Sequence, residues 1–257
     1  MPVPAGASDV PQRRLILFAK VPEPGRAKTR LAPGLGEEGA ARLYQAFLDD
    51  AIALCGRVEG ASLELWASGG AGTSGVAGAS ADAGASDDAG VSADAGVREY
   101  FAGRYPGLPV RLQSGRGLGE RLSGAFESSF AAGADHVVIT GSDHPTLPSS
   151  YLDRAFSALI DVQLVIGPSA DGGYYAIGLA RHAWPEAASL FIGVPWSTPA
   201  VLETTRRTAR RLGLGHVELP EWYDVDDPSV LRRLRREADP ASHTGRMLAR
   251  LPVGTPR

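Results

Sequence analysis

The chain has little of several features that would point to a particular class of protein. It contains a single cysteine, Cys55, which excludes an internal disulfide and a zinc site built on cysteines. Its apolar runs are all much shorter than the roughly 20 residues that a membrane-spanning helix needs. Its formal net charge is only -3, so overall charge favours neither nucleic acid nor an anionic membrane as a partner. We therefore expect a cytoplasmic protein without a membrane span.

Length and composition are typical of one globular domain. A hydrophobic share of 44% within 257 residues is enough to form a sizeable core. Residues 1–12 are rich in proline and alanine and contain no apolar signal-peptide core, so we predict a disordered tail there. We predict one domain over residues 13–238 and a C-terminal tail over residues 239–257.

Short apolar runs alternate with helical patterns along the chain. The predicted strands span residues 14–19, 63–67, 109–113, 136–140, 163–167, 173–179 and 216–219. The predicted helices span residues 38–55, 121–130, 150–160 and 199–212, and a last helix begins near Pro228. This alternation predicts an α/β fold with a mostly parallel sheet and helices on both faces. In such a sheet the ligand crevice lies beyond the carboxyl ends of the strands.

One segment does not follow this alternation. The chain reads SGVAGA, SADAGA, SDDAGV and SADAGV over residues 74–97, four copies of a six-residue pattern. These copies offer only alanine and an occasional valine for burial, which cannot offset the entropy of ordering. We predict that residues 68–97 are a flexible insertion between two strands of the same domain.

A basic loop, VPEPGRAKTRLAP, follows the first predicted strand. Gly25 allows the backbone to approach a ligand closely, Lys28 supplies a point charge, and Arg26 and Arg30 can bind oxygens with two hydrogen bonds each. The loop lacks the adjacent Gly-Lys-Ser/Thr of a Walker A motif. The residues themselves leave two interpretations open, a phosphate-binding loop and a solvated basic loop.

Two acidic segments contain carboxylates that are candidate metal ligands. Asp143, in GSDHPTLP, follows a predicted strand at the expected crevice, where it could bind Mg²⁺ or simply form a turn. In YDVDDPSVL, Asp227 is well explained as a helix cap before Pro228. Asp224 and Asp226 have no such explanation, and Asp226 is a candidate second metal ligand.

The segment GPSADGGYYAIGL has a pair of glycines between two predicted strands. Gly172 and Gly173 could form a tight hairpin, or they could let the backbone approach a ligand with Asp171 directed into the crevice. Tyr174 and Tyr175 point to opposite sides of a strand, so we expect only one of them to reach a ligand.

Six segments together resemble a known family. They are FAKVPEPGRAKTRL, GLGERL, GSDHPTLP, GPSADGGYYAIGL, PWSTPAVLETT and YDVDDPSVL, in the order seen in the DUF2064 proteins, which are glycosyltransferase-like and associated with arsenosugar biosynthesis. The resemblance extends from about residue 15 to residue 234. It implies a GT-A fold, a Rossmann-like domain of the nucleotide-diphospho-sugar transferases that binds its donor through Mg²⁺ or Mn²⁺.

The resemblance also implies roles for individual residues. The implied catalytic residues are Asp143 and Asp171; the phosphate loop is Gly25, Arg26, Lys28 and Arg30; the sugar or acceptor loop is Gly172, Gly173, Tyr174 and Trp196; the metal ligands are Asp143 and Asp226. Trp196 by its residue type alone is more typical of a core position. Two departures from the family pattern are Gly117, where many relatives have an acid, and Asp227, where threonine is common.

We therefore expect a metal-dependent transferase that uses a nucleotide sugar and a small-molecule acceptor. A second expectation is a nucleotidyltransferase, because AKTRL also resembles the phospholactate guanylyltransferases and their molybdenum-cofactor relatives, which release pyrophosphate. A third is a non-catalytic nucleotide-binding protein on the same fold, since a fold alone does not determine a function.

Overall fold

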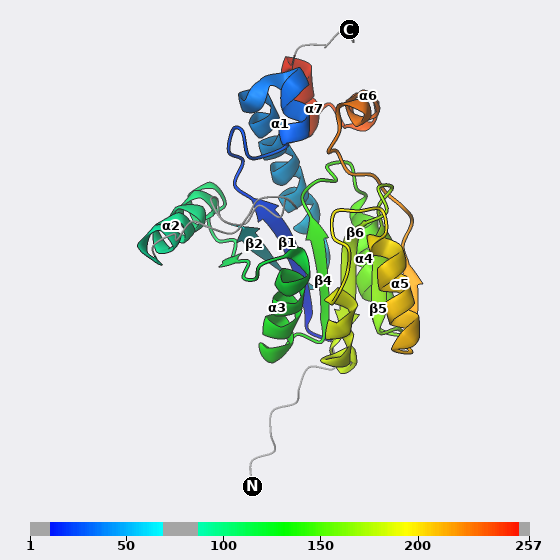
Figure 1. Cartoon of the computed structure of the whole chain (residues 1–257). Coiled ribbons are helices and arrows are strands. Elements are labelled where there is room, and N and C mark those ends of the chain that lie inside the picture. The colour runs from blue at the N-terminus through cyan, green and yellow to red at the C-terminus, as the bar shows by residue number, and fades with distance from the viewer. Residues whose placement is uncertain (1–10, 69–86, 252–257) are drawn as a thin grey trace.

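A mixed sheet forms the centre of the molecule (Figure 1). The computed structural model describes residues 11–68 and 87–251. Within these residues the seven strands of the sheet are β1 (Arg13–Lys20), β2 (Ala61–Ser68), β3 (Val110–Leu112), β4 (His136–Gly141), β5 (Leu164–Pro168), β6 (Tyr174–Ala180) and β7 (His216–Glu218). All of them lie where the sequence predicts a strand.

The strand order is β3-β2-β1-β4-β6-β5-β7. Only β6 is antiparallel to its neighbours, β4 and β5, and the other adjacent pairs are parallel. The carboxyl ends of β1 and β4, the two central strands, therefore lie side by side at one edge. The predicted α/β architecture is confirmed.

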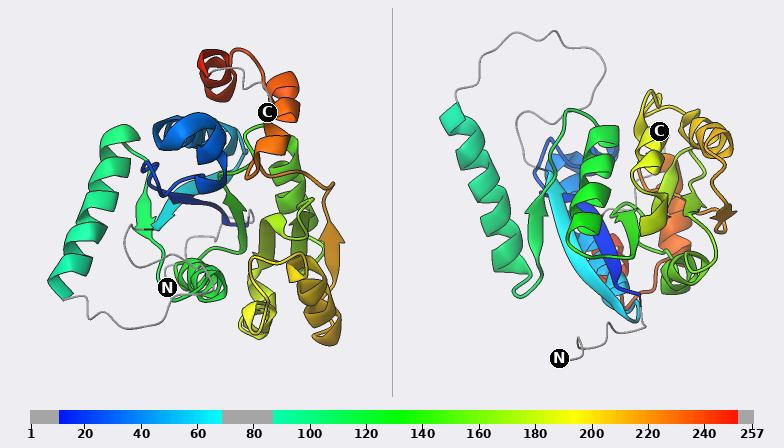
Figure 2. Two further views of the ribbon diagram at one scale, coloured as in Figure 1. Left: turned by 45° about the horizontal axis from the view of Figure 1, so that its top comes forward. Right: turned by 90° about the horizontal axis from the view of Figure 1, so that it is seen from below.

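Helices cover both faces of the sheet (Figure 2). Their bounds are α1 (Ala32–Cys55), α2 (Asp87–Arg104), α3 (Leu118–Ala131), α4 (Ser149–Ala158), α5 (Val201–Arg211), α6 (Leu231–Glu237) and α7 (His243–Arg250). Because side chains alternate along a strand, Leu15 and Leu17 of β1 join the core under α1 and α4, whereas Ile16 joins the core under α3 and α5. Both cores consist of fully buried aliphatic and aromatic side chains.

The predicted flexible insertion is wrong for its last part. Residues 87–97 belong to α2, which ends at Arg104 at the β3 edge of the sheet (Figures 1 and 2). Val97 and Phe101 lie one helical turn apart and are both buried in the core. Val97, the last residue of the repeats, and Phe101, beyond them, together anchor the helix on the core. Residues 69–86 lie outside the described residues.

The predicted tails also need correction where the chain is described. Residues 243–250 form α7, which packs on α1 and buries Leu248 between them. Asp50 of α1 accepts hydrogen bonds from the first two backbone N–H groups of α7, at 2.9 and 2.8 Å. At the other terminus, the carbonyl of Gln12 already accepts the N–H of Asp135 at 2.8 Å. The C-terminal segment resembles a tail in sequence because its apolar residues are few, but Leu248 and Leu251 among them are buried.

In the described part of the chain, no helix combines the length and the apolar character that a bilayer crossing requires.

Candidate functional site

The loops that follow β1 and β4 begin at the same edge of the sheet, because these strands are parallel neighbours. Asp143 comes two residues after the end of β4. The segment that carries Asp226 crosses this edge, and the N–H of Val225 donates to the carbonyl of Asp143 at 3.0 Å. Two acids from distant parts of the sequence are thus brought together, as the sequence predicts.

Lys28 lies between the two acids. Its Nζ is 2.7 Å from Oδ1 of Asp143 and also donates a hydrogen bond to Oδ1 of Asp226. Only 5% of the Lys28 side chain is exposed, and its Nζ lies 5.8 Å from the ring centroids of both Tyr44 and Phe47. The ammonium is therefore enclosed by two carboxylates and two aromatic rings of α1.

The backbone of Lys28 is strained to reach this position. Its φ of 52° and ψ of 44° are left-handed, which costs a residue with a Cβ atom about 1–2 kcal/mol. Lys28 precedes the short 3₁₀ helix Thr29–Leu31, whose Leu31 is fully buried. Strain of this kind concentrates at functional sites, where surrounding contacts hold the residue in place.

Electrostatics keep Lys28 and Asp143 charged. Burial alone would lower the pKa of Lys28, but the carboxylates of Asp143 and Asp226 raise that pKa above its ordinary value. Burial likewise raises the pKa of Asp143, yet the Lys28 ammonium outweighs it and the net pKa is lowered. Asp143 is therefore ionised at neutral pH and available to a cation.

The two carboxylates fit a divalent metal of the Mg²⁺ or Mn²⁺ kind. Each uses its Oδ1 for Lys28, and the side chains of Asp143 and Asp226 remain 40% and 47% exposed. In residues 11–68 and 87–251, no group of three or more acidic, histidine or cysteine side chains is arranged to hold a metal. Mg²⁺ commonly takes one or two protein carboxylates and completes its shell with waters and phosphate oxygens.

Tyr44 links the ends of β1 and β4 beneath this cluster. Its hydroxyl accepts the backbone N–H of Lys20 at 3.0 Å and forms a hydrogen bond with the hydroxyl of Ser142 at 2.8 Å. Burial, with a contribution from Asp143, raises the pKa of Tyr44 to about 12, so the hydroxyl keeps its proton. Tyr44 lies within the helix predicted over residues 38–55, and its polar role has no local signal.

Tyr223 supports the cluster from the other side. Its carbonyl lies 3.2 Å from Nδ1 of His144, and its hydroxyl accepts from Thr146 at 2.9 Å and donates to Glu237 at 2.8 Å. These bonds tie the segment before Asp226 to the loop that contains Asp143. Reasoning from sequence assigned no role to Tyr223, although it lies inside the segment YDVDDPSVL that it singled out.

The rest of the basic loop lies on the outside. Arg26 is exposed and pairs with Glu23 at 2.9 Å, and Arg30 is exposed as well. Gly25 has a φ of 74°, a value that a side chain would disfavour, so the turn itself requires glycine. Of the predicted phosphate residues, the structure brings Lys28 to the acids and leaves the two arginines at the loop surface.

The glycine pair has a packing reason. Gly172 has a φ of 88°, and a Cβ atom there would lie 2.3 Å from the carbonyl oxygen of Pro199. Its own carbonyl accepts the N–H of Leu202 near the start of α5. Asp171 is exposed, and its Oδ1 accepts the N–H of Gly173 at 2.8 Å. This loop is therefore a tight turn that positions Asp171 at the same edge as Asp224.

Asp224 is a further acid at this edge. It accepts a hydrogen bond from the hydroxyl of Ser169, and burial raises its pKa, with additional repulsion from Asp171 and Asp226. Asp224 thus lies near Asp226 of its own motif and near Asp171 of the glycine turn.

Tyr174 and Trp196 contact each other rather than the acids. Their ring centroids lie 6.2 Å apart in an edge-to-face arrangement, within the core under α3 and α5. A Cβ atom at Gly119 would approach Trp196 Nε1 to 2.9 Å, so the start of α3 packs closely on this indole. Tyr175 lies in the opposite core, which confirms that the two tyrosines face different sides.

The architecture is that of a nucleotide-diphospho-sugar transferase fold. The chain is similar to the crystal structure of a "putative nucleotide-diphospho-sugar transferase" from Desulfovibrio desulfuricans G20, with 30% identity, a TM-score of 0.77, and coverage of 94% of this chain and 95% of that one. A structure of 4-diphosphocytidyl-2C-methyl-D-erythritol synthase shares the fold at 11% identity and a TM-score of 0.52, covering 90% and 100%.

The chain belongs to the DUF2064 family. The family model, described as "Uncharacterized protein conserved in bacteria (DUF2064)", matches residues 78–198. The comparison with curated proteins gave no match. The resemblance seen in the six sequence segments is thereby confirmed.

Proposed function

We propose that the protein is a metal-dependent transferase that uses a nucleoside diphosphate sugar as donor and a small molecule as acceptor. The observation that carries this proposal is the convergence of Asp143 and Asp226 on Lys28 at the carboxyl edge of the sheet. The similarity to the Desulfovibrio protein supports the choice of donor class.

Each residue of the cluster has a role in this proposal. Asp143 and Asp226 would hold Mg²⁺ or Mn²⁺, which when bound neutralises the negative charge of a departing diphosphate. Lys28 uses two of its three ammonium donors for the acids and retains one for a phosphate oxygen. Arg26, Arg30 and the flexible turn at Gly25 form the outer part of the phosphate loop.

Asp171 and the neighbouring turn belong to the sugar or acceptor side. The carboxylate of Asp171 is exposed at the same edge as the acid pair, so it can accept hydrogen bonds from sugar hydroxyls. Gly172 and Gly173 hold this turn against α5, while Tyr174 and Trp196 form the packed wall behind it. The proposed donor therefore extends from the loop after β1 towards the turn before β6.

A nucleotidyltransferase is the second candidate. The sequence AKTRL, which contains Lys28, also resembles the loop of guanylyltransferases, and the same cluster could bind a nucleoside triphosphate. The two candidates differ in their product, because one releases a nucleoside diphosphate and the other releases pyrophosphate.

One experiment tests both. Calorimetric titration of nucleotides and nucleotide sugars, with and without Mn²⁺, should give metal-dependent binding of at least one nucleotide sugar. Product analysis of the bound compounds, with GTP and CTP as parallel substrates, then separates release of diphosphate from release of pyrophosphate. Metal-dependent binding without turnover of any donor and acceptor would leave a nucleotide-binding protein and contradict the transferase.

A further inference from the structure

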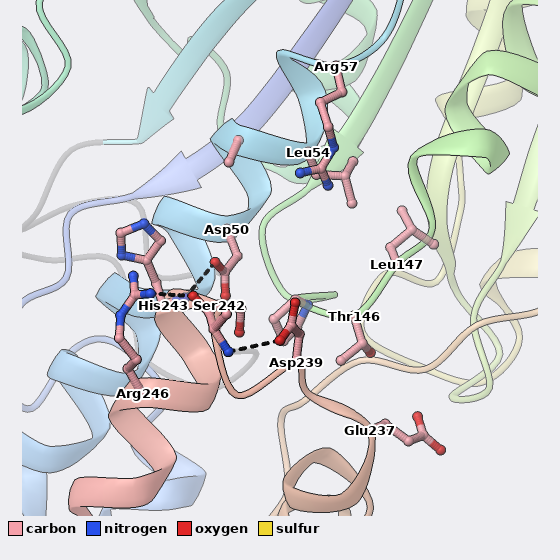
Figure 3. A pocket seen from close by; sticks show the side chains of 13 residues that line it. Asp50, Leu54, Arg57, Thr146, Leu147, Glu237, Asp239, Ser242, His243 and Arg246 are labelled. Atoms are coloured by element: carbon pink, nitrogen blue, oxygen red, sulfur yellow. Dashed lines mark hydrogen bonds between the residues drawn. The ribbon is translucent and has the colours of Figure 1, made fainter.

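A hollow lies between α1 and the C-terminal helices (Figure 3). Its volume is about 570 Å³, within the range of small-molecule sites. Three chain segments form its walls: the second half of α1, residues 145–147, and the segment from Glu237 to Arg246. Neither Lys28 nor Asp143 nor Asp226 lines it. A molecule bound there would not occupy the transfer site.

The lining combines a small apolar area with a polar surround. Ala53, Leu54 and Leu147 supply the apolar part, and Thr146 and Ser242 add hydroxyl groups. A sugar or another polyol matches this lining, because it combines apolar C–H groups with polar hydroxyls. A purely apolar ligand would leave these polar groups without partners.

The acids of the lining are already bonded within the protein. Both oxygens of Asp50 accept backbone N–H groups of α7, and Asp239 accepts the N–H of Ala241 at 2.8 Å. Glu237 accepts the hydroxyl of Tyr223 at 2.8 Å and pairs with a guanidinium of its own helix. These hydrogen bonds hold the three carboxylates in place, and Glu237 also has a cationic partner, Arg233 of its own helix.

Arg57 is different. It comes two residues after the end of α1 and lines the hollow, and Figure 3 shows it at the opposite end from Glu237. Its guanidinium forms no hydrogen bond or ion pair with any residue that the structure describes. A planar group with five donors is well suited to a carboxylate or a phosphate.

We propose that this hollow is an effector site for a small phosphorylated or carboxylated polyol, with the anionic group on Arg57 and the hydroxyls on the opposite wall. Thr146 and Glu237 both line the hollow, and both bond to the hydroxyl of Tyr223. Tyr223 in turn contacts His144, the neighbour of Asp143. Occupancy of the hollow therefore affects the two segments that carry the acid pair.

Binding is tested on the full chain with glucose 6-phosphate and gluconate as probes, and with glucose and inorganic phosphate as comparisons. We expect at least one acidic polyol to bind more tightly than either comparison. Arg57→Ala should weaken it about tenfold or more, because a charge-assisted pair is lost. Arg42→Ala, on α1 but 70% exposed and outside the lining, should bind as the parent does.

Failure of both acidic polyols to bind, or equal binding by Arg57→Ala, would overturn the site. Inorganic phosphate binding as tightly as glucose 6-phosphate would overturn the polyol assignment.

An effect of this site on transfer rests on the proposed function. The coupling between the hollow and the acidic segments does not, so its test uses no nucleotide. The Val225 amide donates to Asp143, and its NMR signal reports on the distance between the two acidic segments. Probe binding should shift this signal in the parent. Tyr223→Phe, which keeps the ring under Arg233, should still bind the probe but lose the shift. If the Val225 signal of Tyr223→Phe still shifted on probe binding as it does in the parent, coupling through the Tyr223 hydroxyl would be contradicted, whatever the outcome of the transferase assays.

Discussion

At the scale of single residues, Lys28 decides the character of the candidate site. Its ammonium lowers the pKa of Asp143 and holds the carboxylates of Asp143 and Asp226 at one point. Removing either acid leaves the other to balance the buried charge. Removing one carboxylate should therefore leave the fold intact. It should weaken metal binding, because less negative charge remains at the site.

Asp143→Asn tests this distinction. The amide oxygen can still accept from Lys28, and the side chain is 40% exposed, so the free energy of unfolding should change by about 1 kcal/mol or less. Nucleotide affinity in Mn²⁺ should fall about tenfold or more, because a metal ligand is lost. Calorimetric titration and thermal unfolding measure the two quantities.

Asp161→Asn is the matched control, since Asp161 is an exposed acid at the opposite edge of the sheet, just before β5. It should change neither quantity. Equal metal-dependent binding by Asp143→Asn and by the parent would remove Asp143 from the metal site.

At the scale of elements, a bidentate ion pair joins α5 to the edge strand β7. Arg206 donates two hydrogen bonds of 2.7 Å to Glu218, and each side chain is 29% exposed. Arg206 lowers the pKa of Glu218 in the folded protein. The pair therefore stabilises the fold above the unfolded-state pKa of glutamate, about 4.3, and this contribution is lost as pH falls through the lower folded-state value.

Glu218→Gln should accordingly lower the free energy of unfolding by about 0.5–1 kcal/mol at pH 7. The difference from the parent should shrink as the pH is lowered below about 4, where the parent also loses the charge. Denaturant unfolding at several pH values measures it. Glu203→Gln, whose carboxylate is 3.7 Å from Arg206 and 58% exposed, should have the smaller effect. A pH-independent difference would mean that packing, and not charge, accounts for the loss.

At the scale of the whole molecule, the C-terminal segment is part of the folded domain. Leu248 and Leu251 of this segment join Leu43 and Phe47 of α1 in a third core, which also contains Val225 beside Asp226. Residues near the C-terminus thus pack on the N-terminal helix, next to the candidate site, and also line the hollow.

Leu248→Ala should therefore cost about 2–4 kcal/mol, the usual range for truncating a buried leucine. Denaturant unfolding of the full chain measures it. Arg250→Ala, an exposed position on the same helix, serves as the control and should change stability little. A Leu248→Ala variant as stable as the parent would restore the view of this segment as a tail.

The sequence by itself determined the sheet, the order of its elements and the two motifs that meet at its edge. Strand and helix periods are local properties, so Leu15, Ile16 and Leu17 reveal a strand buried on both faces without knowledge of the fold. Asp143 and Asp226 are candidate metal ligands from the sequence, and no helix cap explains either of them. The rule that ligands lie beyond the carboxyl ends of parallel strands then placed them together.

Only the tertiary structure decided which groups those acids bind and what supports them. Lys28 and Asp226 are 198 positions apart. Nothing in either segment specifies the left-handed backbone of Lys28 that brings its ammonium to Asp226. The same holds for Tyr223 and for the helices formed by residues 87–97 and 243–250, whose few apolar side chains become ordered only against α1 and the sheet. Local propensity is weak there, and burial supplied by distant residues determines the structure.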